Sequence, residues 1–210
     1  MKKNEESRSL IIGLTGTYCA GKNHVARLFE ARGIPVLDVD KLGHKALEIE
    51  RDVIVARFGP HILGQDGTVD RRRLGALVFG NPGELAALEG IVHPAANRLT
   101  HEWIASQEGR HCIINAALLH RSAVFDLLDA VILVKASLLT RLIRARKRDR
   151  LSWTGLLKRI AGQRGFTSVY LKKPGVYTVY NRGWTHACAC IWRRGLEKRI
   201  VSLATALGLL

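Results

Sequence analysis

The sequence predicts an α/β fold with a parallel sheet flanked by helices and a helical insertion between two of its strands. Apolar runs of strand length lie at residues 10–12, 35–37, 112–116 and 130–134, with helical patterns between them. Such alternation is typical of parallel sheets. The second and third runs are separated by a helix-rich stretch, 41–106, that is too long for a simple crossover. It therefore predicts an inserted subdomain.

Composition narrows the class of protein. The chain has 210 residues, of which 47% are hydrophobic, and 33 basic against 18 acidic side chains give a net charge of +15. This surplus favours anionic partners such as nucleic acid, acidic membranes or phosphorylated small molecules. The sequence lacks a secretory signal and a run of transmembrane length. We therefore expect a cytoplasmic protein that does not bind membranes.

The first strand leads into a glycine-bounded loop, GTYCAGKN, at residues 16–23, and a helical pattern follows. Strand, loop and helix in this order form a phosphate-binding loop, where backbone N–H groups and the helix N-terminus hold phosphate oxygens. Lys22 would reach the β- and γ-phosphates. The alternative is a chance Gly-Lys pair. The residues expected to hold the nucleotide here are Gly16, Thr17, Cys19, Ala20, Gly21, Lys22, Asn23 and His24.

Two carboxylates end the second strand. Asp38 and Asp40 share one strand face, at the carboxyl edge where parallel sheets bind ligands. Beside a phosphate loop, a carboxylate can take the proton of an attacking hydroxyl. Asp40 is the candidate base, and Asp38 could help to hold Mg²⁺ through water. The alternative is a strand-end pair on a surface loop.

The inserted region reads as three helical stretches. The first covers residues 41–58, and the second is a helix capped by Asp70. The third is a longer helix that begins at Asn81-Pro82 and ends at about residue 106. For His93, a structural histidine at a helix end is a more common role than a catalytic residue. The role of Arg71, with two arginine neighbours, cannot be read from spacing alone.

The segment 138–150 is rich in arginine. Arg141, Arg144 and Arg148 fall on one helical face and favour a lid that closes over phosphates. The alternative is a solvated basic face. A helix over 153–163 with Ser152 as its cap, a basic loop over 165–175, a strand over 176–180 and a helix over 194–207 complete the pattern.

The four cysteines show no disulfide spacing. On a strand, His186, Cys188 and Cys190 would share one face and could bind a metal, but small core residues are the favoured interpretation. We expect Cys19, at a helix N-terminus, to have a lowered pKa and a redox-sensitive thiol.

Several motifs, in order, resemble the dephospho-coenzyme A kinase family. They begin with the phosphate loop and continue with GIPVLDVD at 33–40. The most specific part follows: Phe58-Gly59, DGTVDR at 66–71, Leu74, VFGNP at 78–82 and IVHP at 91–94. Later matches are Arg141, Arg148-Asp149, Arg159-Ile160-Ala161, Gln163 and Asn181-Arg-Gly183.

The resemblance implies a P-loop kinase within one unit, 1–210. Its core would be 10–40, 110–138 and 175–210, its coenzyme-A-binding part 41–108, and its lid 139–174. With ATP and Mg²⁺ it would phosphorylate the ribose 3′-hydroxyl of dephospho-coenzyme A. The implied catalytic residues are Lys22, Asp40 and Arg141; Arg148 and Asn181 would bind ATP, and Asp38, Asp40, Arg71 and His93 the acceptor.

The chain departs from that family at two places. Asn23-His24 stand where the family has Ser-Thr, so Asn23 becomes the candidate Mg²⁺ ligand through its amide oxygen. Asn115 to Arg121 replace the family's Asp-x-Pro-Leu-Leu-x-Glu segment, and the tail at 184–192 also differs. The alternatives are another P-loop nucleoside or nucleotide kinase and a weakened nucleotide-binding paralogue. We expect a monomer that does not bind specific nucleic acid.

Overall fold

The computed structural model describes residues 8–149, 152–163, 165–171, 175–182 and 189–210, without the side chains of 171 and 189–194. The chain forms two compact units, one made of Met1–Leu37 with Gln107–Leu210 and the other of Asp38–Ser106. The first unit contains the sheet, and the second is helical.

Five strands in the described chain form one sheet in the order β2-β3-β1-β4-β5. Their bounds are β1 Ile11–Gly16, β2 Val36–Asp38, β3 Cys112–Asn115, β4 Ala130–Lys135 and β5 Val176–Tyr180. The central strand β1 is parallel to β3, with Leu14 opposite Asn115, and to β4, with Gly16 opposite Val134. The carboxyl ends of β1, β3 and β4 therefore meet at one edge, and the predicted α/β fold class is confirmed.

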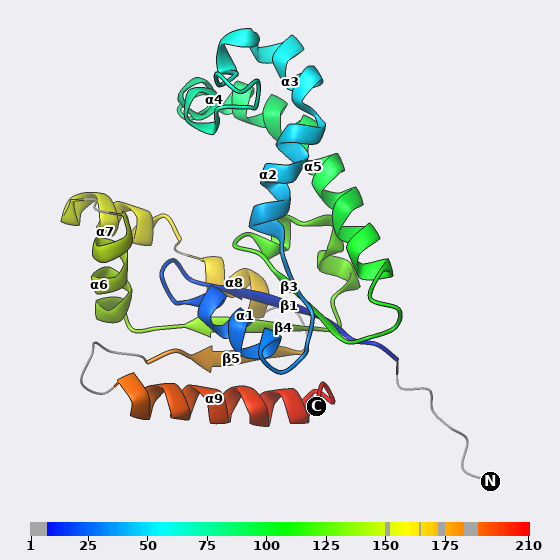
Figure 1. Ribbon diagram of the computed structural model, residues 1–210. Coiled ribbons are helices and arrows are strands. Elements are labelled where there is room, and N and C mark those ends of the chain that lie inside the picture. Colours follow the sequence, from blue (N-terminus) through cyan, green and yellow to red (C-terminus); the bar gives the residue numbers. More distant parts are fainter. Residues whose placement is uncertain (1–7, 150–151, 164, 172–174, 183–188) are drawn as a thin grey trace. The chain divides into compact units, whose positions relative to one another are not determined.

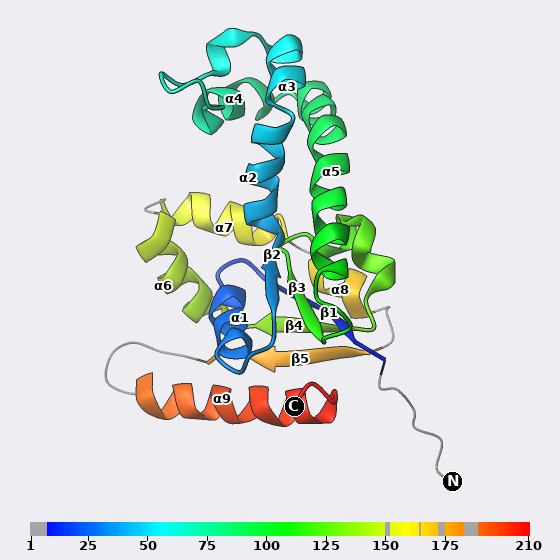
Figure 2. The same cartoon turned by 45° about the vertical axis from the view of Figure 1, so that its right-hand side comes forward.

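One face of the sheet is covered by α1 (Lys22–Glu30) and α9 (Ala189–Ala206). In two views α9 runs alongside β5 (Figures 1 and 2). Phe29 and Ile200 from these helices are fully buried in one cluster with Ile12 and Ile132 of the sheet. This cluster is the main core and holds the start of α1 against the end of β1.

The opposite face of the sheet meets η2 (Leu119–Arg121), η3 (Ala123–Leu127) and α8 (Phe166–Leu171). Gly13 allows this close approach, because a Cβ there would lie 2.7 Å from the Leu128 side chain. Tyr170 of α8 is fully buried, with ring centroids of Phe166 and His120 at 5.0 and 5.4 Å. The loop predicted over 165–175 was wrong at 166–171, because two aromatic residues spaced i, i+4 bury one face of a short helix there; residues 172–174 lie outside the described part.

Two helices follow β4 in the same unit. They are α6 (Leu138–Asp149) and α7 (Trp153–Ala161), which lie next to each other (Figure 1). The Ser152 hydroxyl accepts a hydrogen bond from the Gly155 N–H, so the predicted cap is confirmed. The arginine-rich segment is thus the helix α6. Whether its arginines are solvated or bound follows from their contacts with the loop after β1.

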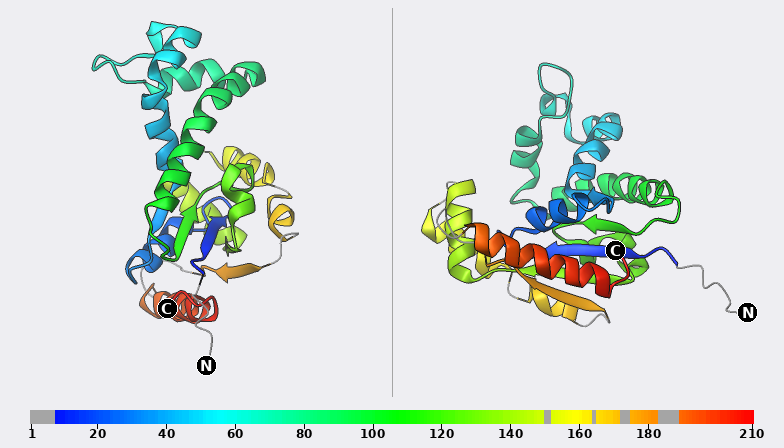
Figure 3. Two further views of the ribbon diagram at one scale, coloured as in Figure 1. Left: turned by 90° about the vertical axis from the view of Figure 1, so that its right-hand side faces the viewer. Right: turned by 60° about the horizontal axis from the view of Figure 1, so that its bottom comes forward.

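The second unit consists of α2 (Val39–Ile49), α3 (Arg51–Phe58), η1 (Pro60–Ile62), α4 (Arg71–Val78) and α5 (Pro82–Ala105). Helices α2 and α5 run side by side (Figures 2 and 3). The carboxylate of Asp70 and the amide of Asn81 cap α4 and α5, as predicted. The single helix expected over 41–58 is instead two, which meet at Glu50. Ile54, Ile62 and Leu74 belong to a separate apolar core.

Two further sequence expectations concern the tail and the membrane. Cys190 lies in α9, so the strand that was to align it with His186 and Cys188 was wrong at that position; those two residues lie outside the described part. Across the described residues, no helix is long and apolar enough to cross a membrane.

Candidate nucleotide-binding site

The loop between β1 and α1 depends on glycine at position 21. Gly21 has φ of 94° and its carbonyl accepts from the N–H groups of His24 and Val25, at 3.1 and 3.3 Å. A Cβ at this position would collide with the side-chain nitrogen of Asn181. Glycine is thus required for both backbone conformation and space. The loop ends at the N-terminus of α1, where backbone N–H groups suit an anion.

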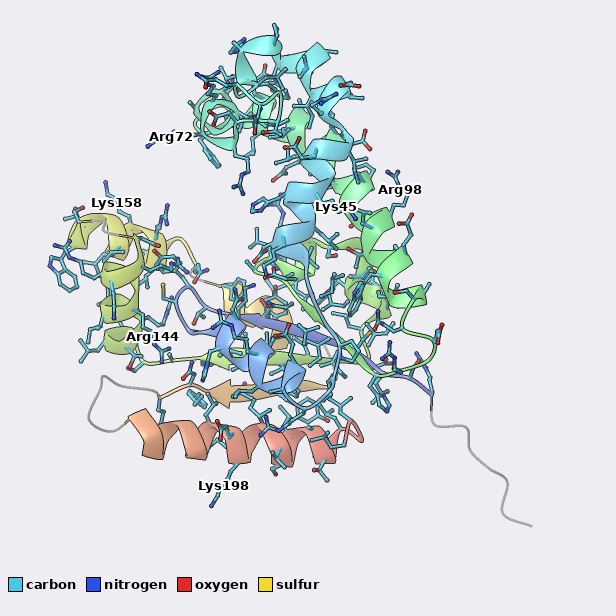
Figure 4. The ribbon with its side chains drawn as sticks, viewed as in Figure 1. Lys45, Arg72, Arg98, Arg144, Lys158 and Lys198 are labelled. Atoms are coloured by element: carbon cyan, nitrogen blue, oxygen red, sulfur yellow. The ribbon has the colours of Figure 1, made fainter. Side chains whose placement is uncertain are left out.

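Arg144 and Asn181 brace this loop from two other segments. Arg144 donates to the Ala20 carbonyl at 2.9 Å and to the Asn181 oxygen at 3.2 Å, and Asn181 donates to the same carbonyl at 2.9 Å. Figure 4 labels Arg144 on α6. Asn181, which the resemblance implies as an ATP-binding residue, lies against the loop itself. The sequence placed Arg144 on the right helical face but did not identify this role.

Arg141 and Gln163 hold the backbone of Tyr18, a residue of the loop. Arg141 Nε donates to the Tyr18 carbonyl at 2.8 Å, and the Tyr18 N–H donates to Gln163 Oε1 at 2.7 Å. Burial lowers the pKa of both Arg141 and Arg144. Two arginines of α6 therefore contact the phosphate loop directly, and the solvated-face interpretation does not apply to them.

The Tyr18 side chain extends the contact to the ends of α6 and α7. Its hydroxyl donates to Asp149, and the Arg148 and Arg159 guanidinium carbons lie 5.1 and 5.9 Å from its ring centroid. The Arg148 hydrogen bond, at 2.6 Å, holds the pKa of Asp149 at about 2. Arg148, predicted to contact phosphate, is bound here to Asp149.

Cys19 is the non-glycine residue in the loop with a left-handed backbone, φ of 58°. Its thiol is partly buried, and burial raises its pKa, an effect that outweighs the lowering by Arg148, Arg141 and Arg144. The expected lowered pKa was therefore wrong. At neutral pH the thiol form dominates, which does not favour a redox-sensitive thiolate.

Lys22, Asn115 and Asn23 form a hydrogen-bonded chain at the carboxyl end of β3. Lys22 Nζ donates to Asn115 Oδ1 at 3.0 Å, and Asn115 Nδ2 donates to Asn23 Oδ1 at 3.2 Å. Asn115 is 2% exposed, whereas Asn23 is exposed. The sequence marked position 115 only as a departure from a family pattern. Its contact with the loop was missed because 92 residues separate the two asparagines.

The donor set of the loop fits a polyphosphate. The Thr17 hydroxyl oxygen is buried without a hydrogen-bond partner in the described structure. It adds a donor to the helix N-terminus and the Lys22 ammonium. Gly16 ends β1, Ala20 is buried, and His24 lies in the first turn of α1. Charged and neutral N–H and O–H donors in one loop are the groups that bind phosphate oxygens.

The remaining candidates belong to the second unit. Asp38 ends β2, and its buried Oδ1 has no hydrogen-bond partner among the described residues. Asp40 lies exposed in the first turn of α2. Arg71 of α4 contacts the His44 ring at 2.8 Å, and His93 is exposed on α5. His44 was not identified from the sequence. The described residues contain no cluster of three His, Cys, Asp or Glu side chains suited to a metal.

A Gly-Lys loop between the central strand of a parallel sheet and its first helix, braced by arginines from the helix after β4, defines a P-loop kinase-like protein. Residues 10–167 match the family described as dephospho-CoA kinase. The chain therefore belongs to the dephospho-CoA kinase family.

Relatives named dephospho-CoA kinase support this assignment. One from Shouchella clausii is 39% identical over 163 residues, which cover 75% of this chain and 83% of the relative. Another from Geobacter metallireducens is 33% identical over 199 residues, which cover 90% and 98%.

Solved structures share the fold. A crystal structure from Thermus thermophilus has a TM-score of 0.74 and 32% identity, and the match covers 93% of this chain and 98% of that one. A dephospho-CoA kinase from Campylobacter jejuni, at 23% identity, has a TM-score of 0.64 over 92% and 97% of the two chains.

Proposed function

We propose that this protein transfers the γ-phosphate of ATP to the ribose 3′-hydroxyl of dephospho-coenzyme A, giving coenzyme A and ADP. The observation that carries the proposal is the loop ending in Gly21-Lys22, held at the end of β1 by Arg144 and Asn181, in a chain of this family. The alternatives of another nucleotide kinase and a weakened paralogue are not favoured. A cytoplasmic monomer that acts on small molecules remains part of the proposal.

The loop and α6 would bind the triphosphate. Lys22, the backbone N–H groups and the Thr17 hydroxyl would hold its phosphate oxygens, and Arg141 would stabilise the charge that develops on the transferred group. These groups are positioned before ATP arrives, because hydrogen bonds to Tyr18 and Ala20 already fix the loop. Preorganised donors of this kind need little rearrangement during the reaction.

The acceptor would be handled by the second unit. We propose Asp40 as the base that accepts the proton of the 3′-hydroxyl. Asp38, whose Oδ1 has no hydrogen-bond partner in the part of the chain that the structure describes, would be a second contact for the acceptor. Arg71 and His93 would bind other parts of dephospho-coenzyme A. Arginine suits its phosphate groups, because the guanidinium can donate two parallel hydrogen bonds.

Magnesium would accompany ATP and neutralise charge between its β- and γ-phosphates. The eighth position of the phosphate-loop motif, which supplies a hydroxyl ligand, is Asn23 here. Its Oδ1 already accepts the Asn115 hydrogen bond, and this engaged, neutral oxygen does not fit the metal-ligand role. No step of the proposed reaction therefore depends on a metal held by the loop.

The experiment is ADP release from ATP with and without dephospho-coenzyme A, with the product identified by mass. We expect acceptor-dependent release and one added phosphate on the acceptor. Asp40→Asn should lower kcat by about 10²-fold or more while ATP still binds. Asp52→Asn, on an exposed position of α3, is the control and should be unchanged. Acceptor-independent release, or full activity of Asp40→Asn, would contradict the proposal.

A further inference from the structure

The Lys22 ammonium determines the orientation of two carboxamides. An ammonium can only donate hydrogen bonds, so the Asn115 atom 3.0 Å from Lys22 Nζ must be the oxygen. The amino group of Asn115 then faces Asn23, and its partner there, 3.2 Å away, must be the Asn23 oxygen. The Lys22 ammonium therefore fixes the donor and acceptor roles in both hydrogen bonds that link Lys22, Asn115 and Asn23.

This polarity decides what Asn23 can offer a ligand. Its oxygen is turned to the buried Asn115, and its amino group is on the other branch of the carboxamide. The side chain itself is exposed at the start of α1, where the proposed function places the nucleotide phosphates. We propose that Asn23 is a phosphate-binding N–H donor, held in this orientation by Asn115, and that it is not a metal ligand. The inference rests on ATP binding in the proposed function.

Asn115 is suited to this positioning role because its side chain is nearly fully buried and its strand is rigidly paired. It is 2% exposed at the end of β3, opposite Leu14 of the central strand. An asparagine here can accept from Lys22 and donate to Asn23 at once. An aspartate of the same shape would accept from both and would turn the Asn23 carboxamide around, with its oxygen toward the ligand.

The test measures the Kd of ATP by calorimetry, in EDTA and in Mg²⁺, for the full-length protein and for Asn23→Ala. Removing a hydrogen bond to an ionised phosphate should weaken binding by about 10-fold. An N–H donor acts on the phosphate whether or not the metal is present, so we expect this loss in both buffers. Loss in Mg²⁺ alone would identify a metal ligand and overturn the proposal.

Asn115→Asp provides a reversal test. In that background the Asn23 oxygen would face the nucleotide, so Asn23→Ala should then weaken ATP binding only in Mg²⁺. Comparing each pair with and without Asn23→Ala cancels the charge that the aspartate adds. Asn97→Asp, the same chemical change on α5, is the control and should leave the pattern of the unmodified protein. An unchanged pattern in Asn115→Asp would contradict the positioning role.

Binding and turnover separate this inference from the proposed function. A protein that binds ATP with the expected pattern but does not phosphorylate dephospho-coenzyme A would uphold the role of Asn23 and contradict the proposed reaction. Acceptor-dependent turnover, together with a loss of ATP affinity in Asn23→Ala that occurs only in Mg²⁺, would support the proposed reaction and contradict the role of Asn23. Since Asn23 is exposed, Asn23→Ala should fold, and it decides the question even if Asn115→Asp does not fold.

Discussion

Position 21 requires glycine for two separate structural reasons. Its φ of 94° lies in the left-handed region, and the space that a Cβ would occupy is filled by the Asn181 side chain. Asn181 is itself 4% exposed and is hydrogen-bonded to Ala20 and to Arg144. A side chain at position 21 would therefore displace the brace that holds the loop.

We predict that Gly21→Ala lowers stability by about 1–3 kcal/mol, from backbone strain and displacement of Asn181. For a chain of this length that is a fall of several degrees in Tm, about 2–4 °C per kcal/mol. ATP binding should weaken as well. Calorimetry measures both quantities.

Gly90→Ala is the matched control for this change. Gly90 lies in α5, its φ is not positive, and a Cβ there would meet nothing within 4 Å. Alanine should raise stability by about 0.5–1 kcal/mol through helix propensity. Equal effects of the two substitutions would show that position 21 makes no special demand.

At this scale the sequence predicted residues whose role is encoded in a local spacing. The motif identifies Gly21 and Lys22 because strand, loop and helix follow in order. Arg144 and Asn181 lie 124 and 161 residues from the Ala20 carbonyl that they bind. A pairing across such distances is set by the sheet, and a local pattern does not contain it. The predicted lowering of the Cys19 pKa was wrong for another reason. Burial of the thiol, which the sequence does not show, raises this pKa by more than the nearby arginines lower it.

Among the elements, α6 and α7 are joined to the phosphate loop through Tyr18. The backbone of this residue contacts Arg141 and Gln163. Its side chain contacts Asp149 and the two arginines whose guanidinium groups lie near its ring. Asp149 has a pKa of about 2, lowered mainly by its hydrogen bond with Arg148. The ionised carboxylate is thus present above its ordinary pKa of about 4 and is lost only as the pH falls through about 2.

We predict that Tyr18→Ala speeds hydrogen exchange of backbone amides at the end of α6 and in α7, because it removes the ring and the hydroxyl together. Tyr18→Phe keeps the ring near both arginines and loses one hydrogen bond, so its exchange should lie close to that of the unmodified protein. Mass spectrometry measures both at neutral pH, where Asp149 is ionised. Equal acceleration by the two variants would assign the whole effect to the hydroxyl and contradict the role of the ring.

The elements themselves were predicted where their apolar period was regular. The strands predicted at 112–116 and 130–134 became β3 and β4 within one residue at each end, because both are short, mainly apolar runs in a buried sheet. Helix α8 was missed, since its signal is one aromatic pair in a basic stretch between glycines. The division of 41–58 at Glu50 was missed because both halves continue the same apolar pattern.

At the scale of the whole molecule, each compact unit has an apolar core of its own among the described residues. Ile132 lies in the core of the sheet, and Ile54 lies in the core of the helical unit; both are fully buried. The surplus of basic over acidic residues lies in the sheet unit, with 25 basic and 8 acidic side chains, whereas the helical unit has 8 basic and 10 acidic ones. Figure 4 labels Arg98 on α5 and Lys198 on α9. Both net charge and the separate cores therefore distinguish the two units.

Separate cores predict separate consequences for the same substitution. Ile54→Ala and Ile132→Ala should each lower stability by about 2–5 kcal/mol through lost burial and a cavity. The contacts described above that brace the loop lie within the sheet unit. Ile54→Ala should therefore leave ATP affinity within about two-fold under conditions where the protein stays folded, and it should speed hydrogen exchange in residues 38–106. Ile132→Ala should weaken ATP binding, because Ile132 packs in the cluster that seats α1 against β1. Equal losses of ATP affinity in the two variants would show that the cores act as one cooperative unit, and would make the nucleotide site dependent on the helical part of the chain.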